Sequence, residues 1–368
     1  MKINSNFWNK KKILITGHTG FKGGWLSIML NQLGCKVSGY SLNPVGKNNF
    51  FNTAKVKKYL KYDFRKNLSD LKYLKKSIKK IDPEIIFHLA AQSSVIESFK
   101  NPSETIISNV LGTSNILEVI KNNNRVKCLI IITTDKVYQN YKGNKYFDEN
   151  SKLGGDDIYS GSKACCEIIT GSYVKSFYSS KRCKVATVRA GNCFGGGDWT
   201  KDRITKDCLE SFSTNKTLFL RRPEATRPWQ HVLEPLHGYL LLAQNLCSKK
   251  SEEFQGPWNF GPNSRQNLKV IKFVNIIKKK MNTKSRIIIK RNDKKFSTKN
   301  YKVFESTNLS LNTNKAFRKL KWKPFLSISK AVDLTIEWYM AFKQRKNLRL
   351  LTEKQIIDYR NKYNSITR

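Results

Sequence analysis

Five polar residues near the middle of the chain could carry out acid–base chemistry. Tyr159 and Lys163 lie four residues apart in a stretch with helical spacing, which puts both side chains on one helix face. A nearby ammonium group favours phenolate, so tyrosine can act as a general base well below its free pKa of about 10. Thr134 ends a predicted strand, which is where parallel sheets hold their ligands, and Asp135 and Lys136 follow it directly. The pattern therefore predicts one catalytic cluster.

A glycine-rich turn near the start of the chain is suited to binding phosphate. It joins a β-branched run, residues 11–16, to the helical spacing of Phe21–Leu33. Such a turn lets backbone amides and a helix N-terminus approach a pyrophosphate. We expect a dinucleotide to contact Gly17, His18, Thr19, Gly20, Phe21, Lys22 and Gly23.

The elements that must position these residues alternate along the chain. Further strands are predicted at 37–42, 59–64, 85–90, 127–134 and 185–189, and further helices at 68–80, 102–121 and 159–180. Strands that alternate with helices of this length predict an α/β fold, a Rossmann-like doubly wound parallel sheet with helices on both faces.

The chain of 368 residues is long enough for two or three domains. We expect a dinucleotide-binding domain in residues 1–190. Residues 191–368 would mainly form a smaller, irregular substrate-binding lobe, because the alternation weakens beyond Gly191. Elements near 233–262 should return to the first sheet, where Leu233–Leu246 has helical spacing and Trp258–Phe260 is strand-like.

The net charge of +42 raises nucleic acid as a partner. Most of the 69 basic residues are lysine, and they spread over several elements, although residues 265–302 are the densest stretch. Readers of phosphates and bases favour clustered arginine and carry recognisable motifs, which are absent here. We therefore expect no nucleic-acid function. The same field would attract a nucleotide substrate.

Other compositional features point to a cytoplasmic protein without a metal site. No apolar run is long enough to span a membrane, and residues 1–12 lack the apolar core of a signal peptide. The eight cysteines show no Cys-x-x-Cys pair and no histidine at the spacing of zinc ligands. We expect no membrane partner and no metal site.

Taken in order, these motifs resemble the extended short-chain dehydrogenase/reductase superfamily. The glycine loop is followed by His88-Leu89-Ala90-Ala91-Gln92, Asn109, Thr134 and the Tyr159–Lys163 pair at matching spacing. Asp135 and Lys136 narrow the resemblance to the sugar-nucleotide dehydratases, because epimerases of the superfamily typically lack such a pair.

Longer strings resemble the CDP-glucose 4,6-dehydratase family. They are the glycine loop, the run from Arg189 to Trp199, the pair Asp202-Arg203, and Arg227-Pro228-Trp229-Gln230-His231-Val232-Leu233-Glu234-Pro235. Related dehydratases usually have glutamate where this chain has Lys136. The resemblance extends over nearly the whole chain.

The resemblance implies that recycled NAD is the cofactor. It adds Asp63, Phe64, Leu89, Ala90, Ala91, Asn109, Thr133, Tyr159 and Lys163 to the expected cofactor site. It implies a substrate site, for a nucleotide sugar such as CDP-glucose, made of Gln92, Thr134, Asn192, Arg203, Arg227 and His231. Homodimers or homotetramers that pair through the helices 102–121 and 159–180 are also implied, as is a product used for 3,6-dideoxyhexoses of surface polysaccharide.

The family's reaction assigns a role to each catalytic residue. Tyr159, with Lys163 and Thr134, would take the proton of the sugar 4-hydroxyl while hydride leaves carbon 4. Lys136, if neutral, would take the carbon-5 proton, and Asp135, if protonated, would help expel the 6-hydroxyl as water. The two groups titrate together, so these last two assignments could be exchanged.

Several positions depart from the family's pattern. Where it has Gln-Pro-Leu-Val-Arg, this chain has Gln92-Ser93-Ser94-Val95-Ile96, and no proline stands within 202–207. The second strand ends without the acid that usually binds the adenosine ribose of NAD. Three alternatives remain open: a dehydratase for another nucleotide sugar, an epimerase, and a dinucleotide-binding protein without activity.

Overall fold

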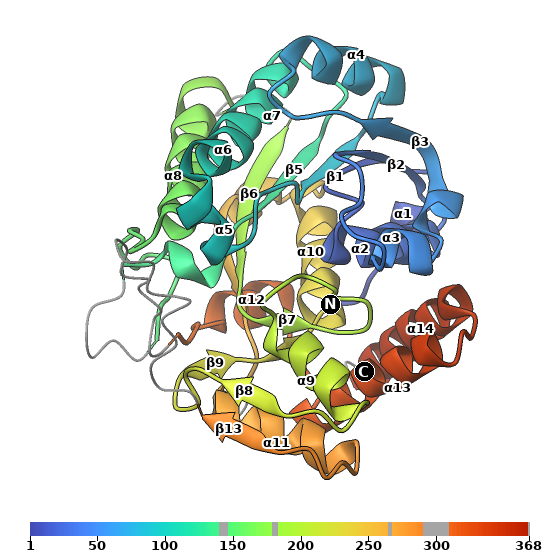
Figure 1. Cartoon of the computed structure of the whole chain (residues 1–368). Coiled ribbons are helices and arrows are strands. Elements are labelled where there is room, and N and C mark those ends of the chain that lie inside the picture. Colours follow the sequence, from blue (N-terminus) through green and yellow to red (C-terminus); the bar gives the residue numbers. More distant parts are fainter. Residues whose placement is uncertain (140–145, 179–182, 264–266, 290–308, 367–368) are drawn as a thin grey trace.

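A parallel sheet of seven strands forms the centre of the protein (Figure 1). The computed structural model describes residues 1–139, 146–178, 183–263, 267–289 and 309–366. The strand order is β11-β6-β5-β4-β1-β2-β3, and every neighbouring pair is parallel. Their bounds are β1 Lys12–Thr16, β2 Lys36–Ser41, β3 Leu60–Arg65, β4 Ile85–His88, β5 Cys128–Ile132, β6 Lys184–Ala190 and β11 Gly256–Phe260. The Rossmann-like fold predicted from the sequence is confirmed.

Helices cover both faces of the sheet (Figure 1). Adjacent residues of β1 point to opposite faces, so Ile13 and Ile15 pack in one buried cluster and Leu14 in another. The first cluster includes residues of α2 (Phe21–Asn31) and α10 (Leu233–Leu246). The second includes residues of α4 (Leu71–Ile81), α7 (Gly112–Ile120) and Tyr178, in the turn after α8 (Ile158–Tyr173).

Two predicted helices on the second face contain π-helical turns. Helix 102–121 is divided into α6 (Pro102–Ile106), the π turn η2 (Ile107–Leu111) and α7. Helix α8 is followed by a second π turn, η4 (Val174–Tyr178). Asp157 starts α8 by accepting a hydrogen bond from the Ser160 amide at 2.9 Å. This cap fixes where the face that carries Tyr159 and Lys163 begins.

The second lobe lies beyond the carboxyl ends of the strands (Figure 1). Its buried cluster packs α9 (Ile204–Phe212), α11 (Val270–Lys280) and α13 (Ile328–Lys343) around Trp229. Among the described residues it also has three two-stranded sheets: β7 (Cys193–Phe194) with β10 (Gln230–His231), β8 (Leu218–Leu220) with β13 (Ile287–Ile289), and β9 (Thr226–Pro228) with β12 (Asn267–Lys269). Much of the basic stretch 265–302 lies outside the described residues.

The remaining elements connect these layers. They are α1 (Ser5–Trp8), α3 (Phe50–Thr53), η1 (Val56–Tyr59), α5 (Val95–Lys100), η3 (Asp135–Val137), η5 (Ser251–Phe254), α12 (Asn314–Leu320) and α14 (Leu348–Ile366). Helix α14 returns to α2, where Gln32 Nε2 donates to the Glu353 carbonyl at 3.1 Å. Within the described residues, no helix has the combined length and apolar character that crossing a bilayer requires.

Candidate active site

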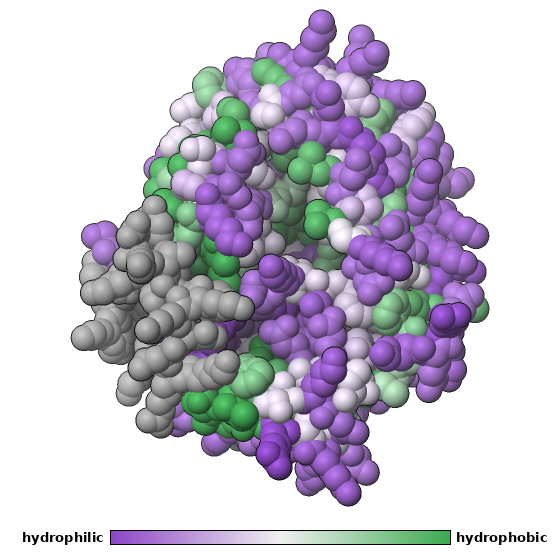
Figure 2. Space-filling view, viewed as in Figure 1, coloured by the Kyte–Doolittle hydropathy of each residue, from purple (hydrophilic) through white to green (hydrophobic). Residues whose placement is uncertain are grey.

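A cavity of about 1760 Å³ opens at the carboxyl ends of the strands, between the sheet and the second lobe. The molecular surface is hollowed here (Figure 2). All five predicted catalytic residues line it. So do these other residues predicted from the sequence: Gly17, Thr19, Gly20, Phe21, Lys22, Gly23, Leu89, Ala90, Ala91, Thr133, Gln92, Asn192, Arg203 and Arg227.

The glycine loop leaves room where a side chain would not fit. Gly17 has φ +77°, and a Cβ added there would lie 2.7 Å from the Ala90 amide nitrogen. A Cβ at Gly23 would lie 2.2 Å from the Gly17 carbonyl oxygen. Gly20, which precedes α2, supplies no side-chain cap, so the positive end of the helix faces the cavity uncapped. This arrangement fits a dinucleotide pyrophosphate.

Four expected cofactor residues lie outside the cavity lining: His18, Asp63, Phe64 and Asn109. His18 is fully buried, and its Nε2 is 2.9 Å from Asp63 Oδ1, which also pairs with Arg65 Nε at 2.7 Å. Burial lowers the pKa of His18, and the bond to Asp63 partly offsets the shift. Phe64 packs edge-on against Tyr73. Here His18 and Asp63 join the glycine loop to β3.

Asn109 also acts at one remove from the cavity. Its Oδ1 accepts from the Gln92 amide at 2.8 Å, and its Nδ2 donates to the Gln92 carbonyl at 3.1 Å and to Ser162 Oγ at 2.8 Å. Asn109 lies in the π turn η2 and is 1% exposed. The structure therefore corrects the expected contact: Asn109 fixes the backbone of a residue that lines the cavity.

Tyr159 and Lys163 differ from the simple phenolate pair expected from their spacing. Burial raises the pKa of Tyr159 to about 12, while a hydrogen bond to Thr134 and the charge of Arg203 act in the opposite direction. The Lys163 ammonium donates to the Ile132 carbonyl at 2.8 Å, and burial lowers its pKa. In this state, Thr134 and Arg203 are the groups that favour phenolate.

Asp135 is a buried acid with one oxygen held. Its Oδ1 accepts from Thr134 Oγ1 at 3.1 Å, and Oδ2 has no hydrogen-bond partner among the described residues. Burial raises the pKa of this carboxyl, although the charge of Lys136 opposes the shift. A raised pKa is what a proton donor needs. Lys136 follows on η3 and lines the same cavity.

The expected substrate contacts divide into two groups. Arg203 and Arg227 belong to the second lobe, where Arg203 precedes β8 in the sequence and Arg227 follows it. Both line the cavity, as does Asn192. His231 does not. It is 1% exposed, its ring packs edge-on against Trp25 and Phe194, and burial lowers its pKa to about 3. The expectation that His231 lines the pocket is wrong, because β10 turns its side chain into the core.

Several lining residues were missed from the sequence. Cys193 lies on β7, its thiol donates to the Gly191 carbonyl at 3.0 Å, and it lines the cavity together with Lys22 of the glycine loop. Arg221, Arg222 and Phe219 line the opposite wall. The two adjacent arginines that follow β8 were a signal that could have pointed to an anion site.

Known dehydratases are similar to this chain over most of its length. Residues 14–335 match the family described as GDP-mannose 4,6 dehydratase. The chain belongs to this dehydratase family. A CDP-glucose 4,6-dehydratase of Salmonella typhimurium is 35% identical over 364 residues, covering 97% of this chain and 98% of the relative. A dTDP-D-glucose 4,6-dehydratase of Dictyostelium discoideum is 30% identical over 211 residues, covering 53% of this chain and 47% of the relative. The resemblance predicted from the sequence is confirmed.

Solved structures share the fold of this dehydratase family member. An epimerase, Mth375, of Methanothermobacter thermautotrophicus has a TM-score of 0.78 at 18% identity and covers 92% of this chain and 95% of its own. A dTDP-glucose 4,6-dehydratase of Bacillus anthracis, solved in complex with NAD, has a TM-score of 0.75 at 21% identity, with 91% and 98% covered.

Proposed function

We propose that this chain is a CDP-glucose 4,6-dehydratase that converts CDP-D-glucose to CDP-4-dehydro-6-deoxy-D-glucose and water. The near full-length similarity to the Salmonella relative carries the proposal. It is supported by the cluster of Thr134, Asp135, Lys136, Tyr159 and Lys163 along one cavity wall. This set combines a proton acceptor for an alcohol with a separate acid and base for an elimination.

The glycine loop and the uncapped start of α2 fit the pyrophosphate of NAD. Gly17, Gly20 and Gly23 would hold it, with Leu89, Ala90 and Ala91 on the neighbouring strand end. Bound there, NAD supplies a hydride acceptor that returns the same hydride, so no second redox substrate is needed. The residues that line the cavity just after β2 are Ser41, Leu42 and Asn43, none of which is an acid. Thr19 and Ser41, whose hydroxyl groups are hydrogen-bonded at 2.7 Å, would offer polar groups to the ribose in place of an acid.

The chain's own residues would carry out four proton transfers. The Tyr159 oxygen takes the proton of the sugar 4-hydroxyl as hydride leaves carbon 4, with Thr134 bridging the two oxygens. Lys136 then takes the carbon-5 proton, which the new 4-keto group acidifies. Asp135 gives its proton to the 6-hydroxyl, which leaves as water while the carbon 5 to carbon 6 double bond forms. Hydride returns to carbon 6 and Lys136 returns a proton to carbon 5.

The second lobe would bind the nucleotide diphosphate. Arg227 is 5% exposed on β9, and its Nη1 is anchored on the Thr226 carbonyl at 2.9 Å. Arg203 lies at the start of α9 and is close enough to Tyr159 to affect its pKa. Both guanidinium groups suit a diphosphate that joins the two halves of the cavity.

The finer setting of the enzyme is also a proposal. We place it in the cytoplasm as a homodimer or homotetramer whose product is used for 3,6-dideoxyhexoses of an O-antigen. Exposed apolar residues on the two helices expected to pair support the assembly: Ile106, Leu111, Ile158, Ile168 and Phe177. Light scattering of the purified protein would measure the assembly, and a monomeric mass would contradict it.

The nucleotide base is the part of the proposal most open to change. Ile96 and Thr205, two positions that depart from the CDP-glucose pattern, both line the cavity. A 4,6-dehydratase for another nucleotide sugar is therefore the second candidate.

Incubation with nucleotide sugars tests both candidates. Purified protein is mixed separately with CDP-glucose, dTDP-glucose, GDP-mannose and a UDP-sugar, with and without added NAD. The 4-keto product is followed by its alkaline absorbance and by the loss of one water in mass spectrometry. Product from CDP-glucose supports the proposal, and product from another sugar alone would replace it with the second candidate. No product from any, with dinucleotide bound, would leave a binding protein without activity.

A further inference from the structure

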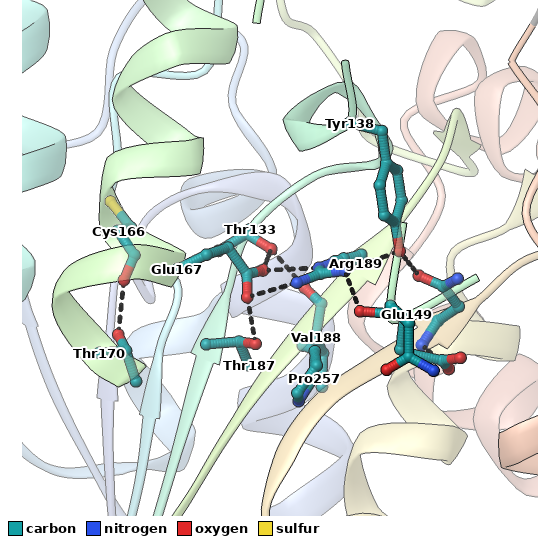
Figure 3. A network of polar contacts seen from close by, with 12 residues as sticks. Thr133, Tyr138, Glu149, Cys166, Glu167, Thr170, Thr187, Val188, Arg189 and Pro257 are labelled. Carbon is teal, nitrogen blue, oxygen red and sulfur yellow. Dashed lines mark hydrogen bonds and ion pairs between the residues drawn. The ribbon is translucent and has the colours of Figure 1, made fainter. Parts of the chain in front are cut away.

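A buried ion pair joins β6 to α8 and contacts Thr133, the residue before Thr134 (Figure 3). The Arg189 guanidinium on β6 makes two parallel bonds to Glu167 on α8, from Nε to Oε1 and from Nη2 to Oε2, both at 3.0 Å. Both side chains are 3% exposed. Desolvation offsets most of the attraction in such a pair, so net stability alone is a weak reason for its presence.

Glu167 reaches the catalytic segment from one side. Its Oε1 accepts from Thr133 Oγ1 and its Oε2 from Thr187 Oγ1, each at 2.5 Å (Figure 3). Thr133 immediately precedes Thr134, and Glu167 lies one helical turn after Lys163 on α8. The Glu167 carboxylate therefore holds Thr133, the residue directly before Thr134, Asp135 and Lys136.

Arg189 reaches the same segment from the other side. Its Nη1 donates to Tyr138 Oη at 2.8 Å, and the guanidinium lies 4.9 Å from the centre of the Tyr138 ring. The Tyr138 hydroxyl in turn donates to Asn259 Oδ1 on β11 at 2.7 Å. Burial raises the pKa of Tyr138, so this hydroxyl keeps its proton. The donor and acceptor of each hydrogen bond are therefore fixed: Arg189 donates to Tyr138, and Tyr138 donates to Asn259.

These two contacts, Glu167 with Thr133 and Arg189 with Tyr138, flank η3, the short turn that carries Asp135 and Lys136. Thr133 is held before this turn and Tyr138 after it, and Arg189 links the two contacts because it bonds both Glu167 and Tyr138. Tyr159 and Lys163 are positioned by other contacts: the Tyr159 amide donates to Ser98 Oγ at 3.2 Å, and the Lys163 ammonium donates to the Ile132 carbonyl at 2.8 Å. The C-terminal side of η3 thus has its own anchor, at Tyr138.

We propose that Arg189 and Tyr138 are positioning residues for the elimination step, holding Asp135 and Lys136 in register with the sugar while contributing little to the oxidation at carbon 4. This inference rests on the proposed function and adds a division of labour to it. A shift of about 1 Å in a reacting group can slow a step about a hundredfold. The elimination is the step that a loosened η3 would slow.

Tyr138→Phe tests the inference with a matched control. The change removes one buried hydroxyl and leaves the Glu167–Arg189 pair in place. Tyr178→Phe is the control: Tyr178 is also buried, and its hydroxyl donates to the Leu117 carbonyl at 2.6 Å, in a buried cluster that does not include Tyr138. Thermal unfolding of both variants compares the stability cost of losing one hydroxyl.

Three signals are followed with CDP-glucose and NAD in D2O. They are the near-ultraviolet absorbance of reduced nicotinamide, the amount of 4-keto-6-deoxy product, and deuterium at carbon 5. In Tyr138→Phe we expect product formation to fall about tenfold, equivalent to about 1.4 kcal/mol, with reduced nicotinamide and CDP-4-ketoglucose accumulating. Tyr178→Phe should keep the wild-type ratio of oxidation to product.

Each other outcome decides against one of the two proposals. If Tyr138→Phe keeps the wild-type ratio of oxidation to product formation, whether both rates fall equally or neither falls, the positioning role is overturned. If Tyr138→Phe does not fold, Arg189→Lys, which keeps the charge but loses the two-pronged contact, must show the same accumulation or the inference fails. If the wild-type protein dehydrates no nucleotide sugar, the proposed function itself is wrong, whatever the variants do.

Discussion

Gly191 faces Asp135 so closely that a Cβ added at Gly191 would lie 2.6 Å from Asp135 Oδ2. The same Cβ would lie 2.6 Å from Pro228 Cγ, so the neighbour on the other side leaves no space. Glycine at 191 therefore keeps free the carboxyl oxygen that has no hydrogen-bond partner among the described residues.

Gly191→Ala should abolish most dehydratase activity, because it pushes the Asp135 carboxyl out of place. We expect kcat to fall at least about tenfold. Gly171→Ala on α8 is the control, because nothing lies within 4 Å of its Cβ, and it should stabilise the protein by about 0.5–1 kcal/mol. Steady-state kinetics and chemical unfolding measure both. Full activity in Gly191→Ala would show that Asp135 is free to move.

Asp135→Asn should separate oxidation from dehydration. The amide keeps the shape and can still accept from Thr134, but it has no acidic proton to give to the 6-hydroxyl. We expect CDP-4-ketoglucose to form while the product falls about a hundredfold or more, in the range seen for loss of a general acid. The product has one oxygen atom fewer than CDP-4-ketoglucose, so mass spectrometry distinguishes the two. An unchanged product rate would assign proton donation to another group.

Gly17→Ala should remove dinucleotide binding. The new Cβ would press on the Ala90 backbone at 2.7 Å, and alanine tolerates the φ of +77° poorly. We expect the increase in melting temperature that NAD gives the wild-type protein to disappear. If CDP alone raises the melting temperature of the variant as much as that of the wild-type protein, the second lobe is still folded. Retained NAD stabilisation would contradict the assigned role of the loop.

Stability should depend on pH through Glu234 on α10. Burial raises its pKa to about 7, against an ordinary value of 4.5 for a glutamate in water; its Oε1 accepts from the Phe325 and Leu326 amides and its Oε2 from the Tyr359 hydroxyl. The folded protein thus binds more protons than the unfolded chain between those pH values. The contribution of this group is complete below about pH 4.5 and is lost as pH rises through 7, by roughly 3 kcal/mol.

Glu234→Gln mimics the protonated acid and should remove that slope. The difference in unfolding free energy between wild type and variant, measured from pH 5 to 8, should move in favour of the variant as pH rises. A difference that is flat with pH would mean that Glu234 titrates alike in both states.

The sequence predicted the site best where chemistry and backbone position coincide. Thr134, Asp135 and Lys136 follow the last residues of β5, and parallel strands always bring such positions to one edge. The glycine loop was equally visible because only glycine fits it. In both cases a local pattern fixes the place of the residue in the sheet.

Residues whose position depends on distant contacts were predicted less well. The motif around His231 indicates a site, but it does not show to which side of the two-residue strand β10 the His231 side chain points. In the structure the ring packs against Trp25 in the core. Asn109 required the π turn to be known before its contact with Gln92 could be expected. The Tyr138–Arg189–Glu167 network joins segments far apart in the sequence, so spacing carries no trace of it.

The return of α14 to α2 has a consequence for how the protein folds. Gln32 and Glu353 are 321 residues apart, and Tyr59 also hydrogen-bonds with Glu353. Contacts of such separation form late, because a long loop must close before they contribute. While a ribosome is still synthesising the chain, the helix behind the nucleotide loop stays uncovered on one side, and that apolar surface is open to chaperones or to aggregation.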